Sequence, residues 1–447
     1  MIDDSPKLNV LLYCERPAEA ANAATIIDHV DAFGKYSRHR IRLWSTRGGL
    51  PSEEELKQFD CIVVHYSMSL LYDAYVSRDS LERLRNFPGM KLLFLQDEYR
   101  RVNFTCDKIR YAKIDTLFTC APKGGVAEKI YAGLNGEVSL VTTLTGYVPE
   151  ALTELKTNPI AQRSIDVGYR ARKCPFWYGR KSHEKYLIGK QFVERTKNSN
   201  LRNDVSSSEK DRIYGDKWVE FLADCKATLG TESGASLIDF TGEVEYTLNR
   251  WQAFHPFHEF EDVPPRLLEQ DGKIELQVIS PRCFEAAALG TVMILYPGEY
   301  SGALVADEHY LRLEKDFSNV DEVVRRLSDY EELERVAANA RRDLVESGDY
   351  SYRSFIRDFD EAVDELVLRK QWKPVGEEVT LPDLCDAANL NVSTGPVGLM
   401  GRLLRYKRWL WKNMPHWIKF LLGVTLLKRK YYCHFNAKEY RYLKEAH

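Results

Sequence analysis

The sequence predicts an α/β protein built from two consecutive α/β domains. Short apolar runs alternate with helical stretches through most of the chain, and this alternation starts a second time after a polar stretch at residues 153–164. Near-continuous runs of Val, Ile and Leu are typical of buried parallel strands, and the helical patterns between them complete βαβ units. A length of 447 residues is too great for one ordinary core and fits two domains with extra segments.

The first domain is expected over residues 1–150. A helical pattern at residues 18–33 separates its first two strands. The expected strands are residues 8–13, 40–45, 61–67, 91–96 and 115–120, with a last strand and exit over 139–152.

The second domain is expected over residues 151–370. It begins with a strand in 164–172 and continues with helical stretches at 183–197 and from 216 onward. Residues 276–297 predict a short apolar run, a helix of small residues and a buried strand, and residues 351–370 predict a long amphipathic helix.

The carboxyl-terminal part predicts a linker over 371–399, which contains Pro and Gly, and a basic amphipathic segment over 400–447. That segment holds twelve Lys or Arg against two Glu, mixed with Trp, Tyr and Leu. We expect it to bind an anionic membrane surface as an interfacial helix, the alternative being a helix that packs on the core. Because the α/β part resembles no nucleic-acid module, we expect no nucleic acid among the partners.

Cysteine usage and the amino-terminal sequence predict the location of the protein. The nine cysteines are scattered and form no CxxC pair, and the first residues are acidic where a signal peptide needs basic ones. We therefore expect a cytoplasmic protein that is peripheral at the inner face of the membrane.

Polar residues that follow apolar runs are the first site candidates, because ligands of open α/β sheets bind at the carboxyl ends of strands. Asp97 and Glu98 follow the run at 91–96, and His65 follows the run that begins at residue 61. Asp97 or Glu98 could serve as a general base or hold a sugar hydroxyl, and His65 is similarly placed. Helix capping, ion pairs with Arg100 and Arg101, or a structural histidine would explain the same residues.

A basic and aromatic stretch follows the first strand of the second domain. Arg172, Arg180 and Lys185 stand there near the start of a helix, where guanidinium and ammonium groups suit a phosphate or diphosphate. A solvated basic face would look similar.

A Gly- and Ser-rich stretch at 230–243 carries two further candidates. Asp239 could act as a catalytic carboxylate and Glu232 could contact the donor, although a structural turn explains the stretch equally well. No standard phosphate-loop motif is present. His255 and His258 lack a carboxylate or cysteine ligand in register, so we expect no metal site.

The helix of small residues, "SPRCFEAAALG", is the last candidate. Ser280 can cap it and Gly290 can end it, which leaves Arg282 and Glu285 without a structural explanation.

At this helix the chain resembles the carboxyl-terminal domain of GT-B glycosyltransferases of the group 1 and spore-maturation-like kind. "SPRCFEAAALGTVMILYPG" followed by "ADEHYLRLEKDFSNVDEVVRRL" carries the resemblance. It implies a nucleotide-sugar donor in a cleft between two Rossmann-like domains, with Glu285 on the ribose, and Ser280 and Arg282 on the donor side. It also implies that Arg172 or Arg180, with Lys185, holds the donor phosphates. The family's first glutamate is replaced by Gln277.

The resemblance implies an enzyme with no cofactor, whose co-substrate is a UDP-, GDP- or CMP-linked sugar. No DxD stands on a suitable loop, which favours metal independence. We expect transfer to a glycan or lipid-linked acceptor in surface polysaccharide biosynthesis, with an assembly complex as a further partner. Asp97 is then the candidate acceptor base and Asp239 the alternative, His65 and Glu98 are candidate acceptor-binding residues, and Glu232 is a candidate donor-binding residue. The alternative is a non-catalytic nucleotide- or sugar-binding scaffold subunit. An epimerase is disfavoured because neither GxxGxxG nor YxxxK is suitably placed.

Overall fold

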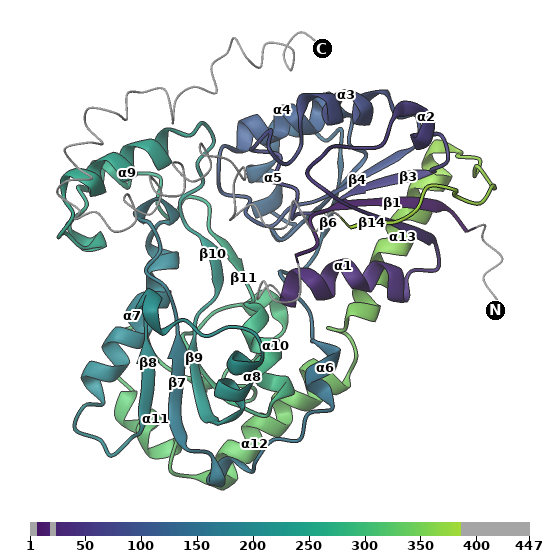
Figure 1. Ribbon diagram of the computed structural model, residues 1–447. Coiled ribbons are helices and arrows are strands. Elements are labelled where there is room, and N and C mark those ends of the chain that lie inside the picture. The colour runs from purple at the N-terminus through teal and green to yellow at the C-terminus, as the bar shows by residue number, and fades with distance from the viewer. Residues whose placement is uncertain (1–6, 18–23, 386–447) are drawn as a thin grey trace, which may run out of the picture.

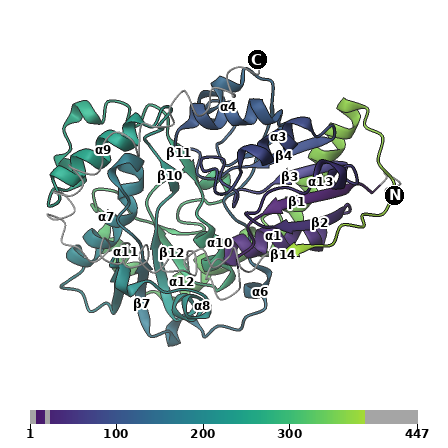
Figure 2. The same cartoon turned by 45° about the horizontal axis from the view of Figure 1, so that its top comes forward.

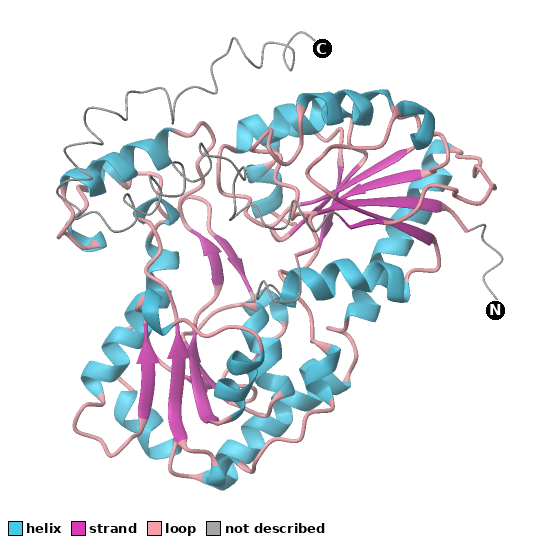
Figure 3. Cartoon of the chain, in the orientation of Figure 1, coloured by secondary structure: helices cyan, strands magenta, loops and turns pink. Residues whose placement is uncertain are grey.

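The computed structural model describes residues 7–17 and 24–385 and contains two α/β domains, each with its own parallel sheet (Figures 1 and 3). The expected fold class is therefore confirmed. The segment 400–447 lies outside the described residues, so its membrane association and the location at the inner face of the membrane stay predictions. Of the helices within the described ranges, none is long and apolar enough to cross a bilayer.

The first sheet has seven parallel strands in the order β14-β2-β1-β3-β4-β5-β6. Its strands are β1 (Asn9–Cys14), β2 (Arg40–Ser45), β3 (Cys61–Val64), β4 (Met90–Phe94), β5 (Thr116–Thr119), β6 (Ser139–Thr142) and β14 (Leu384–Cys385).

Both faces of the first sheet are buried, and alternate residues of β1 enter different cores. Leu11 and Tyr13 pack in the core that α3 and α4 cover, whereas Val10 and Leu12 pack in the core that α1 and α13 cover. The helices of this domain are α1 (Ala24–Tyr36), α2 (Glu53–Leu56), α3 (Arg78–Asn86), α4 (Val102–Ala112), α5 (Val126–Ile130) and α6 (Glu150–Thr153).

The second sheet has five parallel strands in the order β13-β12-β9-β7-β8. Its strands are β7 (Ile165–Arg170), β8 (Asn203–Ser206), β9 (Cys225–Gly230), β12 (Val292–Leu295) and β13 (Leu311–Arg312). Its helices are α7 (Arg180–Arg195), α8 (Asp216–Ala223), α10 (Pro281–Ala288), α11 (Val320–Arg326) and α12 (Tyr330–Arg341).

The chain returns to the first domain at helix α13 (Tyr352–Lys370), which lies beside α1 in both views (Figures 1 and 2). Phe355 and Phe359 enter the core between α1 and the first sheet. Beyond the helix, the indole Nε1 of Trp372 donates to Asp60 at 2.9 Å and β14 pairs with β2. The expected boundaries therefore differ here, since residues assigned to the second domain and the linker complete the first.

A long segment between β9 and α10 forms a second connection between the two domains, on the side away from α13. It contains the antiparallel ribbon of β10 (Ser233–Ala235) and β11 (Leu276–Val278), and helix α9 (Glu243–Phe254), which Figure 3 shows apart from the second sheet. We call residues 233–278 the bridging module, because Leu237, Leu248 and Phe260 belong to the same core as α3 and α4 of the first domain.

Candidate functional site

A cavity of about 1080 Å³ lies between the two domains, and residues of both domains line it. It is placed at the carboxyl ends of the parallel strands. Asp97 follows β4, Arg172 follows β7, and Ser233 comes shortly after β9. This is the edge at which open α/β sheets bind ligands.

Three basic side chains of the second domain meet at this cavity. Arg172 follows β7, Lys185 comes from α7, and Arg282 comes from α10. Lys185 Nζ donates to the Ser233 hydroxyl at 2.9 Å. In the part of the chain that the structure describes, none of the three forms an ion pair with a carboxylate. We call Arg172, Lys185 and Arg282 the cation triad.

The triad alters the acid–base behaviour of Lys185. Burial lowers the pKa of the Lys185 ammonium to about 8, and the Arg282 and Arg172 guanidinium groups act in the same direction. A bound anion would offset this repulsion. The arrangement thus suits a phosphate or diphosphate.

Glu285 lies beside the triad in a small network. Its carboxylate accepts a hydrogen bond from Trp218 Nε1 at 2.8 Å, and the Arg282 guanidinium lies 4.9 Å from the centre of the Trp218 ring. Burial raises the pKa of Glu285, while the Trp218 hydrogen bond and the charge of Arg282 oppose the rise. The other carboxylate oxygen has no hydrogen-bond donor among the described residues, which leaves it available to a ligand hydroxyl.

The start of α10 also faces the cavity. Ser280 occupies the N-cap position, but its side chain makes no capping hydrogen bond, so its hydroxyl is available at the cavity wall. The first domain approaches closely here, since Thr145 Oγ1 donates to the Ile279 carbonyl at 2.7 Å. Gln277 does not line the cavity, whereas its strand neighbours Leu276 and Val278 do. The residue that replaces the family's first glutamate thus points away from the site.

Asp97 is the carboxylate that we expected as acceptor base, and it lines the cavity from the first domain. One of its oxygens accepts a hydrogen bond from the Tyr99 hydroxyl at 2.8 Å. The side chain is otherwise exposed to the cavity. This position is compatible with a base.

Asp239, the alternative catalytic carboxylate, has a structural place instead. Its oxygens accept hydrogen bonds from the backbone N–H groups of Thr241, Gly242 and Glu245 at 2.7–3.2 Å, at the start of α9. It is buried and does not line the cavity. The structure therefore gives no support for a catalytic role.

Glu232 and Arg180 also lie outside the cavity wall. The buried Glu232 carboxylate accepts backbone N–H groups of Glu299 and Tyr300 at 3.1 and 2.9 Å and contacts Lys181, so it holds a turn. The Arg180 side chain is 70% exposed, and its nearest carboxylate is Asp271 at 3.9 Å. Of the two arginines proposed for the donor phosphates, Arg172 is the one that faces the cavity.

His65 and Glu98, the expected acceptor-binding residues, are both committed to internal contacts. The fully buried His65 ring pairs through Nε2 with His29 Nδ1 at 2.9 Å, and burial lowers its pKa. Glu98 lines the cavity, but its carboxylate accepts hydrogen bonds from the Thr119 and Tyr131 hydroxyls and the Cys120 N–H. Burial raises the pKa of Glu98 to about 7.

The cavity residues that the sequence reasoning missed include Asp28 and Tyr66 of the first domain and Trp218 of the second. Burial raises the pKa of Asp28 to about 6, with Asp31 and Glu285 contributing. Tyr66 directly follows His65, the polar residue at the end of the same apolar run, so its position at the strand end was the signal that could have identified it.

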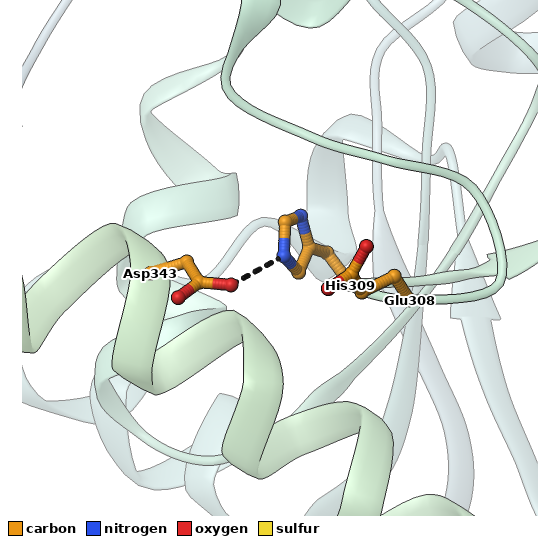
Figure 4. Close-up of side chains that lie close together, drawn as sticks. All are labelled: Glu308, His309 and Asp343. Carbon is orange, nitrogen blue, oxygen red and sulfur yellow. Dashed lines mark hydrogen bonds and ion pairs between the residues drawn. The ribbon is translucent and has the colours of Figure 1, made fainter.

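One group of potential metal ligands occurs among the described residues, in the second domain away from the cavity (Figure 4). It consists of Glu308, His309 and Asp343. His309 Nδ1 accepts the Val305 N–H at 3.1 Å, so Nε2 carries the proton and donates to Asp343 at 2.9 Å. With both ring nitrogens engaged, the histidine stabilises a turn and is poorly suited to a metal.

Two Rossmann-like domains thus face each other across a cavity, as the resemblance implied. Two facing domains with parallel sheets and a cavity between them are the GT-B arrangement that the resemblance implied.

Comparison with known proteins finds similarity in structure alone. No family model and no curated protein sequence matches the chain. The solved structures that are similar include an alpha-glucosyltransferase in complex with UDP, at a TM-score of 0.49 and 10% identity over 81% of this chain and 100% of the other. A T4 phage enzyme, BGT, in complex with UDP-glucose has a TM-score of 0.44 and 9% identity over 81% and 99%. TarM has a TM-score of 0.38 and 11% identity over 68% and 54%.

The comparisons correct one expectation about partners. Among the similar structures is an alpha-glucosyltransferase in complex with UDP and DNA that contains an HMU base. The exclusion of nucleic acid was therefore wrong, because it assumed that a chain of this fold has no nucleic-acid-binding relatives.

Proposed function

We propose that this protein is a glycosyltransferase that takes a sugar from a nucleoside-diphosphate donor and transfers it to a hydroxyl of an acceptor. The observation that carries the proposal is the cation triad beside Glu285 in the cavity between the domains. Glycosyl transfer must stabilise a departing phosphate, and positioned cations supply that stabilisation where the charge develops.

The donor would lie along the second domain. Arg172 and Lys185 would hold the phosphates, Arg282 would add a further positive charge, and Glu285 would accept a ribose hydroxyl. We propose that the reaction is metal-independent, because the triad supplies the positive charge that a metal would otherwise provide.

The acceptor would approach from the first domain. We propose that Asp97 accepts the proton of its hydroxyl, since one carboxylate oxygen remains available beside the Tyr99 contact. A glycan or glycolipid in surface polysaccharide biosynthesis stays our proposed acceptor. The acceptors to be tested should also include DNA that contains an HMU base.

The proposal is tested by nucleotide binding. UDP, GDP and CMP, each alone and as a sugar conjugate, are added to the full-length protein, and its melting temperature is measured. A ligand that binds the native state at about 100 times its Kd adds about 2.7 kcal/mol to the free energy of unfolding. We therefore expect one nucleotide to raise the melting temperature by several degrees. We also expect Lys185→Met to remove this rise.

The matched control is Lys190→Met, which removes an exposed lysine from the same helix and should leave the rise intact. Transfer of the sugar should persist in EDTA if the reaction is metal-independent. A chain that binds a nucleotide but transfers no sugar to any acceptor would favour the scaffold function. A chain that binds neither a nucleotide nor a sugar conjugate would contradict the glycosyltransferase and the nucleotide-binding scaffold alike.

A further inference from the structure

The first-domain wall of the cavity carries two polar groups that the protein itself leaves without a partner. Tyr66 and Asp28 both line the cavity. The Tyr66 hydroxyl oxygen is buried and forms no hydrogen bond of normal geometry with the described residues. The side chain that approaches it is Gln96, whose amide donates to the Thr145 carbonyl at 3.1 Å. The half-buried Asp28 carboxylate likewise forms no hydrogen bond or ion pair with the described part of the chain.

A buried hydroxyl without a hydrogen bond costs free energy, so such a group requires an explanation. Packing fixes the direction of this one, because the Tyr66 ring lies 4.1 Å from the His65 ring and 5.1 Å from the His29 ring, centre to centre. These ring contacts hold Tyr66 at the cavity wall. A ligand in the cavity would therefore be able to form a hydrogen bond with its hydroxyl.

The surroundings of Asp28 restrict the chemistry of that ligand. Asp31, one turn further along α1, is paired with Arg16 at 2.6 Å. Lys35 is paired with Glu150, and it lowers the pKa of Asp28 less than burial, Asp31 and Glu285 together raise it. Glu285 stands across the cavity. Burial, the charge of Asp31 and the charge of Glu285 all raise the pKa of Asp28. This negative region disfavours a phosphate and favours a ligand that donates hydrogen bonds.

Resting on the proposed function, we propose that Asp28 and Tyr66 form a subsite that binds hydroxyl groups of a sugar opposite Glu285. The carboxylate accepts from one hydroxyl, and the Tyr66 phenol donates to another. The sugar is either the glycosyl group of the donor or a sugar of the acceptor, because both present the same hydroxyl chemistry to this wall.

The experiment measures Asp28→Asn and Tyr66→Phe in the full-length protein. Affinity is titrated for UDP, GDP and CMP and for their sugar conjugates, and the KM of the acceptor is measured at saturating donor. We expect both variants to bind the free nucleotide as the wild type does. If the subsite holds the donor sugar, the affinity gained from the sugar falls about tenfold to a hundredfold; if it holds the acceptor, the acceptor KM rises by that factor.

Two comparisons make the result decisive. Glu361→Gln removes an exposed carboxylate from helix α13, outside the cavity wall, and should change neither quantity. Tyr66→Phe removes a hydroxyl that forms no hydrogen bond of normal geometry, so its melting temperature should not fall. Variants that match Glu361→Gln in both quantities would overturn the subsite. A wild-type chain that binds no nucleotide would instead overturn the proposed function.

Discussion

Lys185 carries more of the proposed chemistry than any other single residue of the cavity. Its ammonium is held by the Ser233 hydroxyl alone, beside two guanidinium groups and with no carboxylate paired to it in the described chain. Such an arrangement is unfavourable in the free protein and becomes favourable when an anion binds. Binding of an anion therefore relieves the repulsion among the three cations, and this relief strengthens the binding.

The lowered pKa of Lys185 predicts a pH-dependent affinity for the nucleotide. In the free protein the pKa is about 8, and a bound diphosphate raises it, so binding takes up a proton above pH 8. Affinity is full below pH 8 and is lost as the pH rises. We expect the Kd at pH 9 to be about tenfold higher than at pH 7. Calorimetric titration in two buffers of different ionisation enthalpy measures both the Kd and the proton uptake.

Lys185→Arg is the control, because a guanidinium stays charged over this range. This variant should show a flat pH dependence between pH 7 and pH 9, even if its affinity differs from that of the wild type. A wild-type Kd that does not change over the same range would contradict the role of Lys185 on the phosphates.

At the scale of the element, helix α9 shows why a sequence pattern can indicate a catalytic role for a residue that stabilises a helix start. Asp239 follows an apolar run and precedes a Gly, which fits a catalytic turn and a helix start equally well. The helix start is what the structure shows, with three backbone N–H groups directed at one carboxylate. These hydrogen bonds fix the Asp239 side chain at the start of the helix, where the helix dipole is positive.

We expect Asp239→Ala to lower stability without affecting the donor site. Removing a buried carboxylate that accepts three N–H groups should cost about 2–3 kcal/mol of the free energy of unfolding. Denaturant unfolding measures the loss, and nucleotide titration below the transition should give the wild-type Kd. Normal stability together with abolished transfer would restore the catalytic role that we have withdrawn.

The parts of the fold and site that were predictable are those that leave a periodic pattern in the sequence. The βαβ alternation was visible because buried strands and amphipathic helices impose periods on the sequence. Asp28 was not visible, because it lies within α1, whose sequence pattern does not show which of its polar residues face the cavity. The return of α13 to the first domain was also hidden, since an amphipathic pattern shows that a helix has an apolar face but not which sheet that face covers.

At the scale of the whole molecule, the two domains are joined on both sides of the cavity. Helix α13 packs against α1 on one side, and the bridging module shares its core with α3 and α4 on the other. Two segments that continue from the second domain thus pack into cores of the first domain, which couples the unfolding of the domains. We therefore expect one cooperative thermal transition for the part of the chain described here.

The pair of Arg100 and Glu245 tests the contribution of the bridging module to this coupling. Arg100 follows β4, and its guanidinium binds both oxygens of the buried Glu245 carboxylate of α9, at 2.7 and 3.2 Å. It also lies 5.0 Å from the centre of the Trp177 ring. Removing one partner leaves the other charge buried without compensation, so each single alanine variant should be strongly destabilised.

A double-mutant cycle separates this pair from its surroundings. We expect Arg100→Ala and Glu245→Ala together to cost less than the sum of the single variants, with a coupling of about 0.5–3 kcal/mol in the free energy of unfolding. Because the pair joins the domains beside the cavity, both single variants should also weaken nucleotide-sugar binding more than free nucleotide binding. Additive losses and an unchanged preference for the sugar conjugate would show that the bridging module holds the domains together through its apolar core alone.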